Sequence, residues 1–482
     1  MLARIPLLIY NKTIRKMLKA IIHLETNTKH LQPLVAMVIC GVIKLKHFLL
    51  LYLVTCILAF IPATGHAGAK EDYQEAYTLY LTAAASAAVY NDRIGELANR
   101  YLEQDGWQID HYVQAQGHTG ARYLIAQKKD VPYYLVAIVG TENDKDIKID
   151  LKVDKVYFAG SNEAEFAANA AKKDVPGTEP KVHKGFNQFV QAGLSAVLRN
   201  PRQTSLSLPE LLESDKTRKL YVTGHSLGGA AATLAGARLL SAGISPEQLT
   251  IITFGAPAVG NDAFAAKFEP ILNLTRVVNS GDKITGALQT LVGGYRQFGR
   301  KIKWQPPDTA DDAHQLTAYI DAAIKNYYDK RRLALAAGVQ LPLPSIDKQK
   351  NPGRIYIAPL VNNLPAELAA DYLYMQEALL NEYQQTLPDY VIANNQTDWQ
   401  QPASATGSRW AIVSEVSAMR IKQEKNTYHI TLTQTVYDVT TGTVTATATF
   451  STATYNLTPL EAFIHTFKGM HAHLTDQFAK AS

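Results

Sequence analysis

Cysteine is almost absent from this chain of 482 residues. Both cysteines, Cys40 and Cys56, lie near the N-terminus, and residues 70–482 contain none. A disulfide framework, a thiolate nucleophile and a cysteine-ligated metal are therefore excluded for residues 70–482. His471 and His473 are two residues apart in an expected helix, so their side chains point in different directions and do not favour a metal site. No metal or cofactor is expected.

The greater part of the chain also lacks an excess of charge of one sign. Of 48 Lys and Arg residues, eight lie in residues 1–69, which hold one of the 43 Asp and Glu residues. Residues 70–482 thus carry 40 basic and 42 acidic side chains, a net charge of −2. A basic surface that would favour nucleic acid is not indicated, and that class of partner is excluded.

Residues 1–69 have the pattern of an export leader. A basic segment at residues 44–47 precedes an apolar run at residues 48–61, and Ala67-Gly68-Ala69 offers an A-x-A cleavage site. We predict a signal peptide cleaved after Ala69 and a secreted or periplasmic protein. A start at Met37 would give a leader of ordinary length. The alternative is an uncleaved anchor, with association at a membrane surface or the cell envelope.

The remainder is expected to form two units. In residues 70–335, segments with helical periodicity alternate with strand-like runs, which predicts a mainly parallel sheet with helices on both faces. Residues 336–352 contain several prolines and charges and are interpreted as a linker. Residues 353–482 show the order strand, helix, three strands, helix, which predicts a smaller α+β domain. Its Val- and Thr-rich strands indicate a half-buried sheet.

The most informative segment is Gly224-His225-Ser226-Leu227-Gly228, which fits G-x-S-x-G. An apolar run precedes it and a helical pattern of small residues follows it. A serine on a sharp turn between strand and helix needs small neighbours, which the two glycines supply. We predict that Ser226 is a nucleophile, and that His225 packs beneath the turn.

A serine hydroxyl needs a base to accept its proton and a carboxylate to orient that base. In α/β-hydrolases the chain order is Ser, then Asp or Glu, then His. Asp282 follows an expected strand and is the preferred acid, with Asp262 and Asp311 as rivals. His314 is the one histidine after Asp282 that falls within the first unit, and it is the expected general base.

An oxyanion hole needs two donors. The backbone amide of Leu227 is one candidate, because it opens the helix after Ser226. The second candidate is Thr141, at the Gly-Thr turn after an expected strand; an ordinary strand end is the alternative.

These segments resemble the class 3 lipase family. The resemblance is carried in order by Val182-His183-Lys184-Gly185-Phe186, the elbow, the segment Phe254 to Asn261, and Arg276-Val277-Val278-Asn279 leading to Asp282. It covers residues 71–329 and implies an α/β-hydrolase fold, a Ser226–Asp282–His314 triad and an oxyanion donor at Thr141. The family's arginine before the Gly-Thr pair is replaced by Val139.

The expected function is therefore an exported serine hydrolase that cleaves carboxylic esters of lipids. Phospholipase A1, a carbohydrate-ester esterase and a non-catalytic lipase-like envelope protein are the alternatives. Residues 142–182, with Phe158 and Phe166, are a candidate lid; the alternative is that these residues pack in the core. A chain cut near Asp347 is expected to keep hydrolase activity. The sequence leaves the oligomeric state open.

Overall fold

The structure, a computed structural model, describes residues 64–90, 93–114, 121–140, 154–198, 206–341, 353–393, 398–422 and 424–481. Contacts divide the chain into two compact units, residues 1–68 and 69–482. The apolar run of the predicted leader, residues 48–61, and residues 342–352 of the predicted linker lie outside the described residues.

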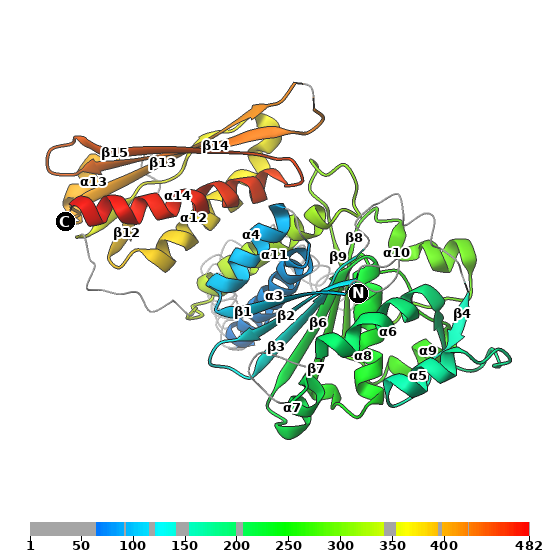
Figure 1. Ribbon diagram of the computed structural model, residues 1–482. Helices are drawn as coiled ribbons and strands as arrows, with labels where there is room; N and C mark the ends of the chain where they lie inside the picture. The colour runs from blue at the N-terminus through cyan, green and yellow to red at the C-terminus, as the bar shows by residue number, and fades with distance from the viewer. Residues whose placement is uncertain are drawn as a thin grey trace, which may run out of the picture. The chain divides into compact units, whose positions relative to one another are not determined.

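A seven-stranded sheet forms the centre of the first half (Figure 1). Its strand order is β1-β2-β3-β6-β7-β8-β9; β1, β2 and β3 pair antiparallel, and the pairs from β3 to β9 are parallel. The strands are β1 (Trp107–Gln114), β2 (Ala121–Lys128), β3 (Tyr133–Ile138), β6 (Lys219–His225), β7 (Leu249–Phe254), β8 (Leu274–Asn279) and β9 (Arg300–Trp304).

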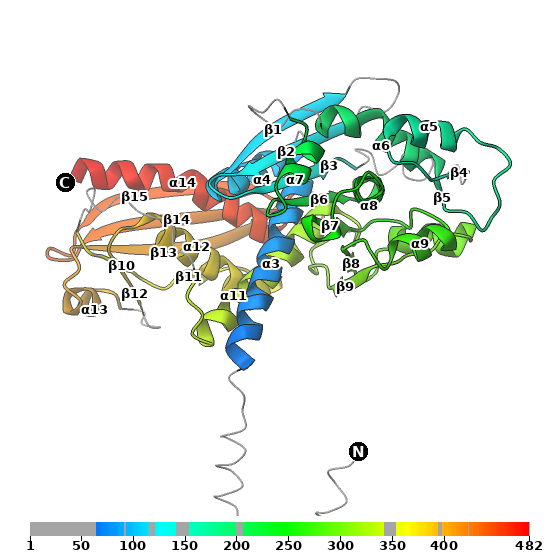
Figure 2. The same ribbon diagram turned by 90° about the horizontal axis from the view of Figure 1, so that it is seen from below.

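Helices cover both faces of the sheet, so most side chains on both sides of β3, β6, β7 and β8 are buried. This is why these strands are short, largely apolar runs. Helices α6 and α8 lie on one face, and α3 and α11 lie on the other (Figure 2). The helices of this half are α3 (Thr64–Ala88), α4 (Arg93–Gln104), α5 (Glu163–Ala170), α6 (Lys184–Leu198), α7 (Leu208–Ser214), α8 (Leu227–Ser241), α9 (Asp262–Phe268), α10 (Ile284–Ala287) and α11 (Leu316–Ala336), with short 3₁₀ and π turns at Pro246–Gln248 and Leu288–Val292.

Helix α3 begins earlier and ends later than its periodicity suggested, and Ala67-Gly68-Ala69 lies in its first turns. It packs against the strand before the elbow, where the Ser86 and Thr223 hydroxyls are 3.0 Å apart. Within the described ranges, no helix is both long enough and apolar enough to cross a membrane.

The candidate lid segment is partly described. Residues 154–183 contain β4 (Lys155–Tyr157), α5 and β5 (Lys181–His183), with β4 and β5 paired antiparallel. The rings of Phe158 and Phe166 are buried, with centroids 4.8 Å apart, and Phe158 also contacts Phe264 and Phe268. These two phenylalanines therefore belong to the core, as the alternative interpretation had it, and do not form the inner face of a lid.

The C-terminal region contains a second sheet, of order β12-β10-β13-β14-β15, with β11 paired to β13. Its strands are β10 (Ile355–Ile357), β11 (Val361–Asn363), β12 (Tyr390–Ile392), β13 (Trp410–Arg420), β14 (Tyr428–Asp438) and β15 (Val444–Ala453). Its helical segments are η5 (Ala366–Asp371), α12 (Tyr372–Thr386), α13 (Gln400–Ala405) and α14 (Pro459–Ala481). Strand β14 alternates buried and partly exposed residues, as expected for a sheet with one covered face.

The predicted fold class, an α/β-hydrolase sheet with a smaller α+β region after it, is confirmed. Sequence reasoning missed the edge strand β1, the short strands β11 and β12, and helix α13. The predicted division into two domains stays a prediction, since both sheets lie within the compact unit 69–482 and share one hydrophobic core.

A buried polar network joins α11 to the C-terminal region. The Thr458 hydroxyl donates to the carboxylate of Asp321 over 2.8 Å, and Asp321 is fully buried. The ammonium of Lys325 lies 2.8 Å from Asp321 and 2.7 Å from Asp371, at the end of η5. Glu461 accepts from the Thr458 amide over 2.7 Å, which closes a capping box at the start of α14. The charges of Asp321, Lys325 and Asp371 are thus stabilised by partners from both regions.

We expect a chain that ends at Gly338 to be less stable than the full chain, because Asp321 and Lys325 would lose Thr458 and Asp371. A buried charge without its partner is strongly destabilising. The melting temperature, followed by circular dichroism, should fall by roughly 5 °C or more, or the truncated chain should aggregate. An equal melting temperature would restore the view that residues 70–335 fold independently.

Burial raises the pKa of Glu461 from 4.5 to about 8. The folded state thus holds this proton more tightly than the unfolded state, and the free energy of unfolding should fall as the pH rises from about 4.5 to about 8. Glu461→Gln keeps the amide-accepting oxygen but cannot ionise. Urea unfolding between pH 5 and pH 8 should show a shallower loss of stability for this variant, by up to about 1.4 kcal/mol per pH unit. Identical slopes would contradict a protonated Glu461.

Candidate active site

The elbow joins β6 directly to α8, with Ser226 between them. Ser226 has φ 55° and ψ −121°, a strained conformation for a residue with a side chain. An added Cβ at Gly224 would overlap the backbone of Gly228, and one at Gly228 would overlap the carbonyl oxygen of Ile138. Glycine is therefore required at both positions by close packing, and these contacts hold the turn in its strained form.

The structure brings Ser226, His314 and Asp282 together. Nε2 of His314 lies 2.9 Å from Oγ of Ser226, and Nδ1 lies 2.9 Å from Oδ2 of Asp282. The three residues come from the end of β6, the loop after β8 and the loop before α11. All three are buried. The rival carboxylates do not fill the same place: Asp262 opens α9, and Asp311 pairs with Lys425.

The carboxylate of Asp282 is kept ionised by its hydrogen bonds. Burial alone would raise its pKa, but donation from His314, Tyr319 and the Ile284 amide holds the pKa below its usual value. The Tyr319 hydroxyl donates to Oδ2 over 2.6 Å, and the Ile284 amide donates to Oδ1 over 2.9 Å. Asp282 thus stays negatively charged where it contacts the imidazole.

Tyr319 is a site residue that sequence reasoning missed. Its hydroxyl donates to Asp282 and accepts from the Asn279 amide over 3.0 Å, so it fixes the acid loop to the last residue of β8. Tyr319 lies five residues after His314, one turn into α11. The sequence showed Tyr319 as part of a helical pattern after His314. The pattern did not indicate that the Tyr319 hydroxyl points toward Asp282.

His225 lies beside the triad. Its ring is buried and tilted against that of His314, with centroids 4.8 Å apart, and its Nε2 bonds the carbonyl oxygen of His314 over 2.7 Å. Burial and the neighbouring imidazole lower the pKa of His225 to about 3, so it is neutral. Since a carbonyl oxygen only accepts, Nε2 carries the proton of this neutral ring.

Of the two expected oxyanion donors, Leu227 lies within the described residues. Leu227 is the first residue of α8, and in the described part of the chain its amide has no hydrogen-bond acceptor. The positive end of the α8 dipole is also at this point. Thr141 lies outside the described residues. Strand β3 leads toward the elbow, because its last residue, Ile138, pairs with Gly224 of β6. Gly140, the residue before Thr141, donates its amide to the Tyr90 hydroxyl over 3.1 Å.

Two other segments that carry the family resemblance, those around His183 and Asn261, stabilise the fold around the site. His183 is buried and stacks on Phe186, with ring centroids 4.1 Å apart. Asn261 caps α9 by accepting from Phe264 over 3.0 Å, and it also accepts from the Lys181 amide over 2.9 Å. Across the ranges that the structure describes, no cluster of three or more His, Cys, Asp or Glu side chains is arranged to hold a metal ion.

Comparison with known proteins finds a family match for part of this chain. The family model Lipase (class 3) matches residues 135–290, which include Ser226 and Asp282 but end before His314. Toxin TseL of Vibrio cholerae is 35% identical over 113 residues, which are 23% of this chain and 15% of that protein. Phospholipase A(1) DAD1 of Arabidopsis thaliana is 35% identical over 109 residues, 22% of this chain and 24% of that protein.

Among solved structures, the lipase of Rhizopus microsporus var. chinensis aligns with a TM-score of 0.36 and 23% identity, covering 50% of this chain and 77% of that one. The chain spans less than a quarter of the length of the two curated relatives, and the family match does not reach the C-terminal region. The predicted resemblance to the class 3 lipase family is thus confirmed over residues 135–290.

Proposed function

We propose that the protein is a serine hydrolase that cleaves carboxylic ester bonds of lipids through an acyl-enzyme intermediate. The observation that carries this proposal is the position of the His314 imidazole, 2.9 Å from both the Ser226 hydroxyl and the Asp282 carboxylate. A hydroxyl becomes a nucleophile when a positioned base accepts its proton, and a buried carboxylate fixes the orientation of that base.

In the acylation step, Ser226 Oγ forms a bond to the ester carbonyl carbon while its proton passes to Nε2 of His314. The negative charge that develops on the carbonyl oxygen is stabilised by the Leu227 amide, with Thr141 as the second donor. Collapse of the tetrahedral intermediate breaks the bond to the alcohol oxygen, which takes the proton from His314. Asp282 stabilises the transient imidazolium and keeps Nδ1 protonated.

In the deacylation step, His314 accepts a proton from water, and the water oxygen attacks the acyl carbon. The acid leaves as the proton returns to Ser226 Oγ. Every proton in this cycle moves between the substrate, water, Ser226 and His314, so the proposed chemistry requires no metal or cofactor.

Lipid esters are the proposed substrates because of the class 3 lipase match at residues 135–290. The match to a phospholipase A(1) of Arabidopsis thaliana favours phospholipids as a second candidate class. Export through the leader, with cleavage after Ala69, is part of the same proposal and rests on the sequence pattern of residues 44–69.

Replacement of the nucleophile tests the mechanism. Ser226→Ala should lower kcat/KM for p-nitrophenyl octanoate by at least about 1,000-fold, because no hydroxyl remains to form the acyl-enzyme. Ser241→Ala is a matched control, since it removes a hydroxyl at the opposite end of α8 that only bonds the Ala237 carbonyl. A fluorophosphonate probe should label the control and not Ser226→Ala. Hydrolysis by Ser226→Ala at the wild-type rate, or no labelling of the wild type, would refute the proposal.

Removal of the Tyr319 hydroxyl tests how Asp282 is positioned. Tyr319→Phe deletes one of the donors to Oδ2 and the acceptor of the Asn279 amide. We expect kcat to fall roughly threefold to tenfold with little change in KM, since the loss affects the relay rather than substrate binding. Tyr328→Phe, also buried on α11, should leave both constants near those of the wild type. A rise in KM alone would assign Tyr319 to substrate binding instead.

A further inference from the structure

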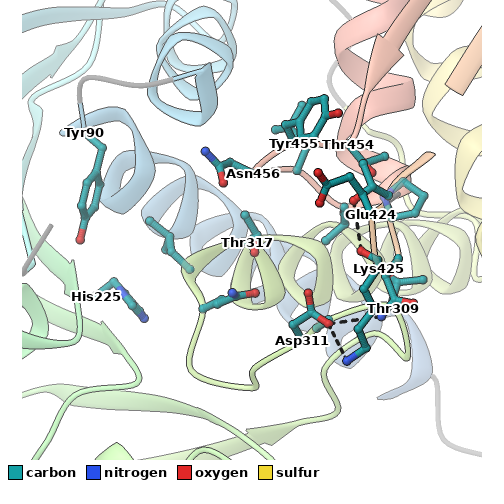
Figure 3. A pocket seen from close by; sticks show the side chains of 18 residues that line it. Tyr90, His225, Thr309, Asp311, Thr317, Glu424, Lys425, Thr454, Tyr455 and Asn456 are labelled. Carbon is teal, nitrogen blue, oxygen red and sulfur yellow. Dashed lines mark hydrogen bonds and ion pairs between the residues drawn. The ribbon is translucent and has the colours of Figure 1, made fainter. Parts of the chain in front are cut away.

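A polar pocket of about 530 Å³ lies beside the triad, between the hydrolase half and the C-terminal region (Figure 3). Pockets of this volume are typical of small-molecule sites. One side is formed by Tyr90 and His225, and another by residues 309–317, the loop and first turn that include His314. The C-terminal region supplies residues 424–427, between β13 and β14, and residues 454–459, between β15 and α14.

Chain neighbours of the proposed nucleophile and base line the pocket, while Ser226, His314 and Asp282 themselves do not. His225 precedes Ser226, and Gln315 follows His314 in the chain. Tyr90 accepts the amide of Gly140, the residue before Thr141. A group bound here would therefore lie next to residues that adjoin the nucleophile, the base and the expected oxyanion loop.

His225 supplies an unused acceptor. Because Nε2 donates to the His314 carbonyl and the ring is neutral, Nδ1 carries a lone pair. The side chain is 7% exposed, and no donor in the described ranges bonds its Nδ1. Figure 3 shows the imidazole directed into the pocket. A ligand group that donates a hydrogen bond would match this acceptor.

The charges of the pocket argue against an anionic ligand. Lys425 is its one cationic side chain, and it lies 3.1 Å from Asp311, which also accepts from Asn426 over 3.4 Å. The remaining formal charge is that of Glu424. A phosphate or carboxylate would thus meet no free cation and one negative charge.

The other lining groups suit hydroxyl groups. Threonine hydroxyls and the amides of Asn426 and Asn456 are the main polar groups of the lining, and such groups both donate and accept. The hydroxyls of Thr427, Thr454 and Thr458 already bond protein groups, so Thr309, Thr317 and Asn456 are the candidates to contact a ligand. The amides of Leu316 and Thr317 add donors, since the first turn of a helix has no intrahelical acceptor for them. Several vicinal hydroxyl groups would match this mixture of donors and acceptors.

We propose that this pocket binds the uncharged, polyhydroxylated alcohol part of the ester substrate, a glycerol or a sugar ring, and that the C-terminal region thereby takes part in substrate selection. This inference rests on the proposed ester hydrolase function. It assigns to the loops at residues 424–427 and 454–459 the recognition of the head group, while the hydrolase half carries out the cleavage.

The test uses the full chain with Asn426→Gly and Asn456→Gly combined. Both asparagines have positive φ, 51° and 55°, so glycine removes the amides without straining the backbone. Asp130→Gly is the matched control: its φ is 63°, and it lies in the turn between β2 and β3, at the end of the sheet opposite the elbow. The substrates share one acyl chain: 6-O-octanoylglucose, 1-octanoylglycerol, 1-octanoylglycerol 3-phosphate and p-nitrophenyl octanoate.

We expect kcat/KM of the double variant to fall about fivefold to tenfold for the glucose ester, the glycerol ester or both, and to stay within about twofold of the wild type for the p-nitrophenyl ester. The Asp130→Gly control should leave all four values unchanged. A loss confined to one neutral ester identifies its alcohol as the ligand. An equal loss on all four esters, no loss on any, or the largest loss on the phosphate ester would overturn the proposal.

Direct binding separates this proposal from the proposed function. Saturation-transfer NMR with methyl glucoside and with glycerol should detect binding to Ser226→Ala, and a weaker signal when the two asparagines are also replaced. Binding without turnover by the wild type would refute the hydrolase and keep the pocket. Turnover that Ser226→Ala abolishes, with no binding and no selectivity change in the asparagine variant, would keep the hydrolase and refute the pocket.

Discussion

The imidazole of His314, bonded on one side to Asp282 and on the other to Ser226, is the interaction on which the proposed chemistry depends. Each partner is held by a separate constraint. The close contact of Gly224 with Gly228 keeps Ser226 in its strained turn, and Tyr319 fixes the Asp282 loop to β8. A relay assembled from three loops keeps its geometry only because the sheet and α11 hold those loops rigidly.

Helix α11 connects this relay to the C-terminal region. It begins two residues after His314, and Tyr319 lies at the end of its first turn. Asp321 and Lys325, in the next two turns, contact Thr458 and Asp371. The helix that positions the base is thus fixed on its far side by the region outside the family match. The same region supplies two loops of the polar pocket beside the triad. Stability and substrate selection are two separate ways in which it can act on the site.

The residues carrying the proposed chemistry were identified in advance because chain order and local pattern constrain them. G-x-S-x-G between a strand and a helix singled out Ser226, and the order Ser, Asp, His left His314 as the one histidine in place. Tyr319, the bond from Thr458 to Asp321, and the pairing of Asp311 with Lys425 carried no such pattern. Each depends on a partner between 37 and 137 residues away, in a direction that periodicity does not encode.

Sequence alone thus determined the fold class, the elbow and the candidate triad, because these follow from short-range patterns of apolar, small and polar residues. Tertiary structure alone decided that Phe158 and Phe166 pack in the core, that α11 is shared with the C-terminal region, and that a polar pocket lies beside the triad. The physical reason is that burial, ion pairing and cavities arise between segments distant in the chain, and only their packing sets which side chains meet.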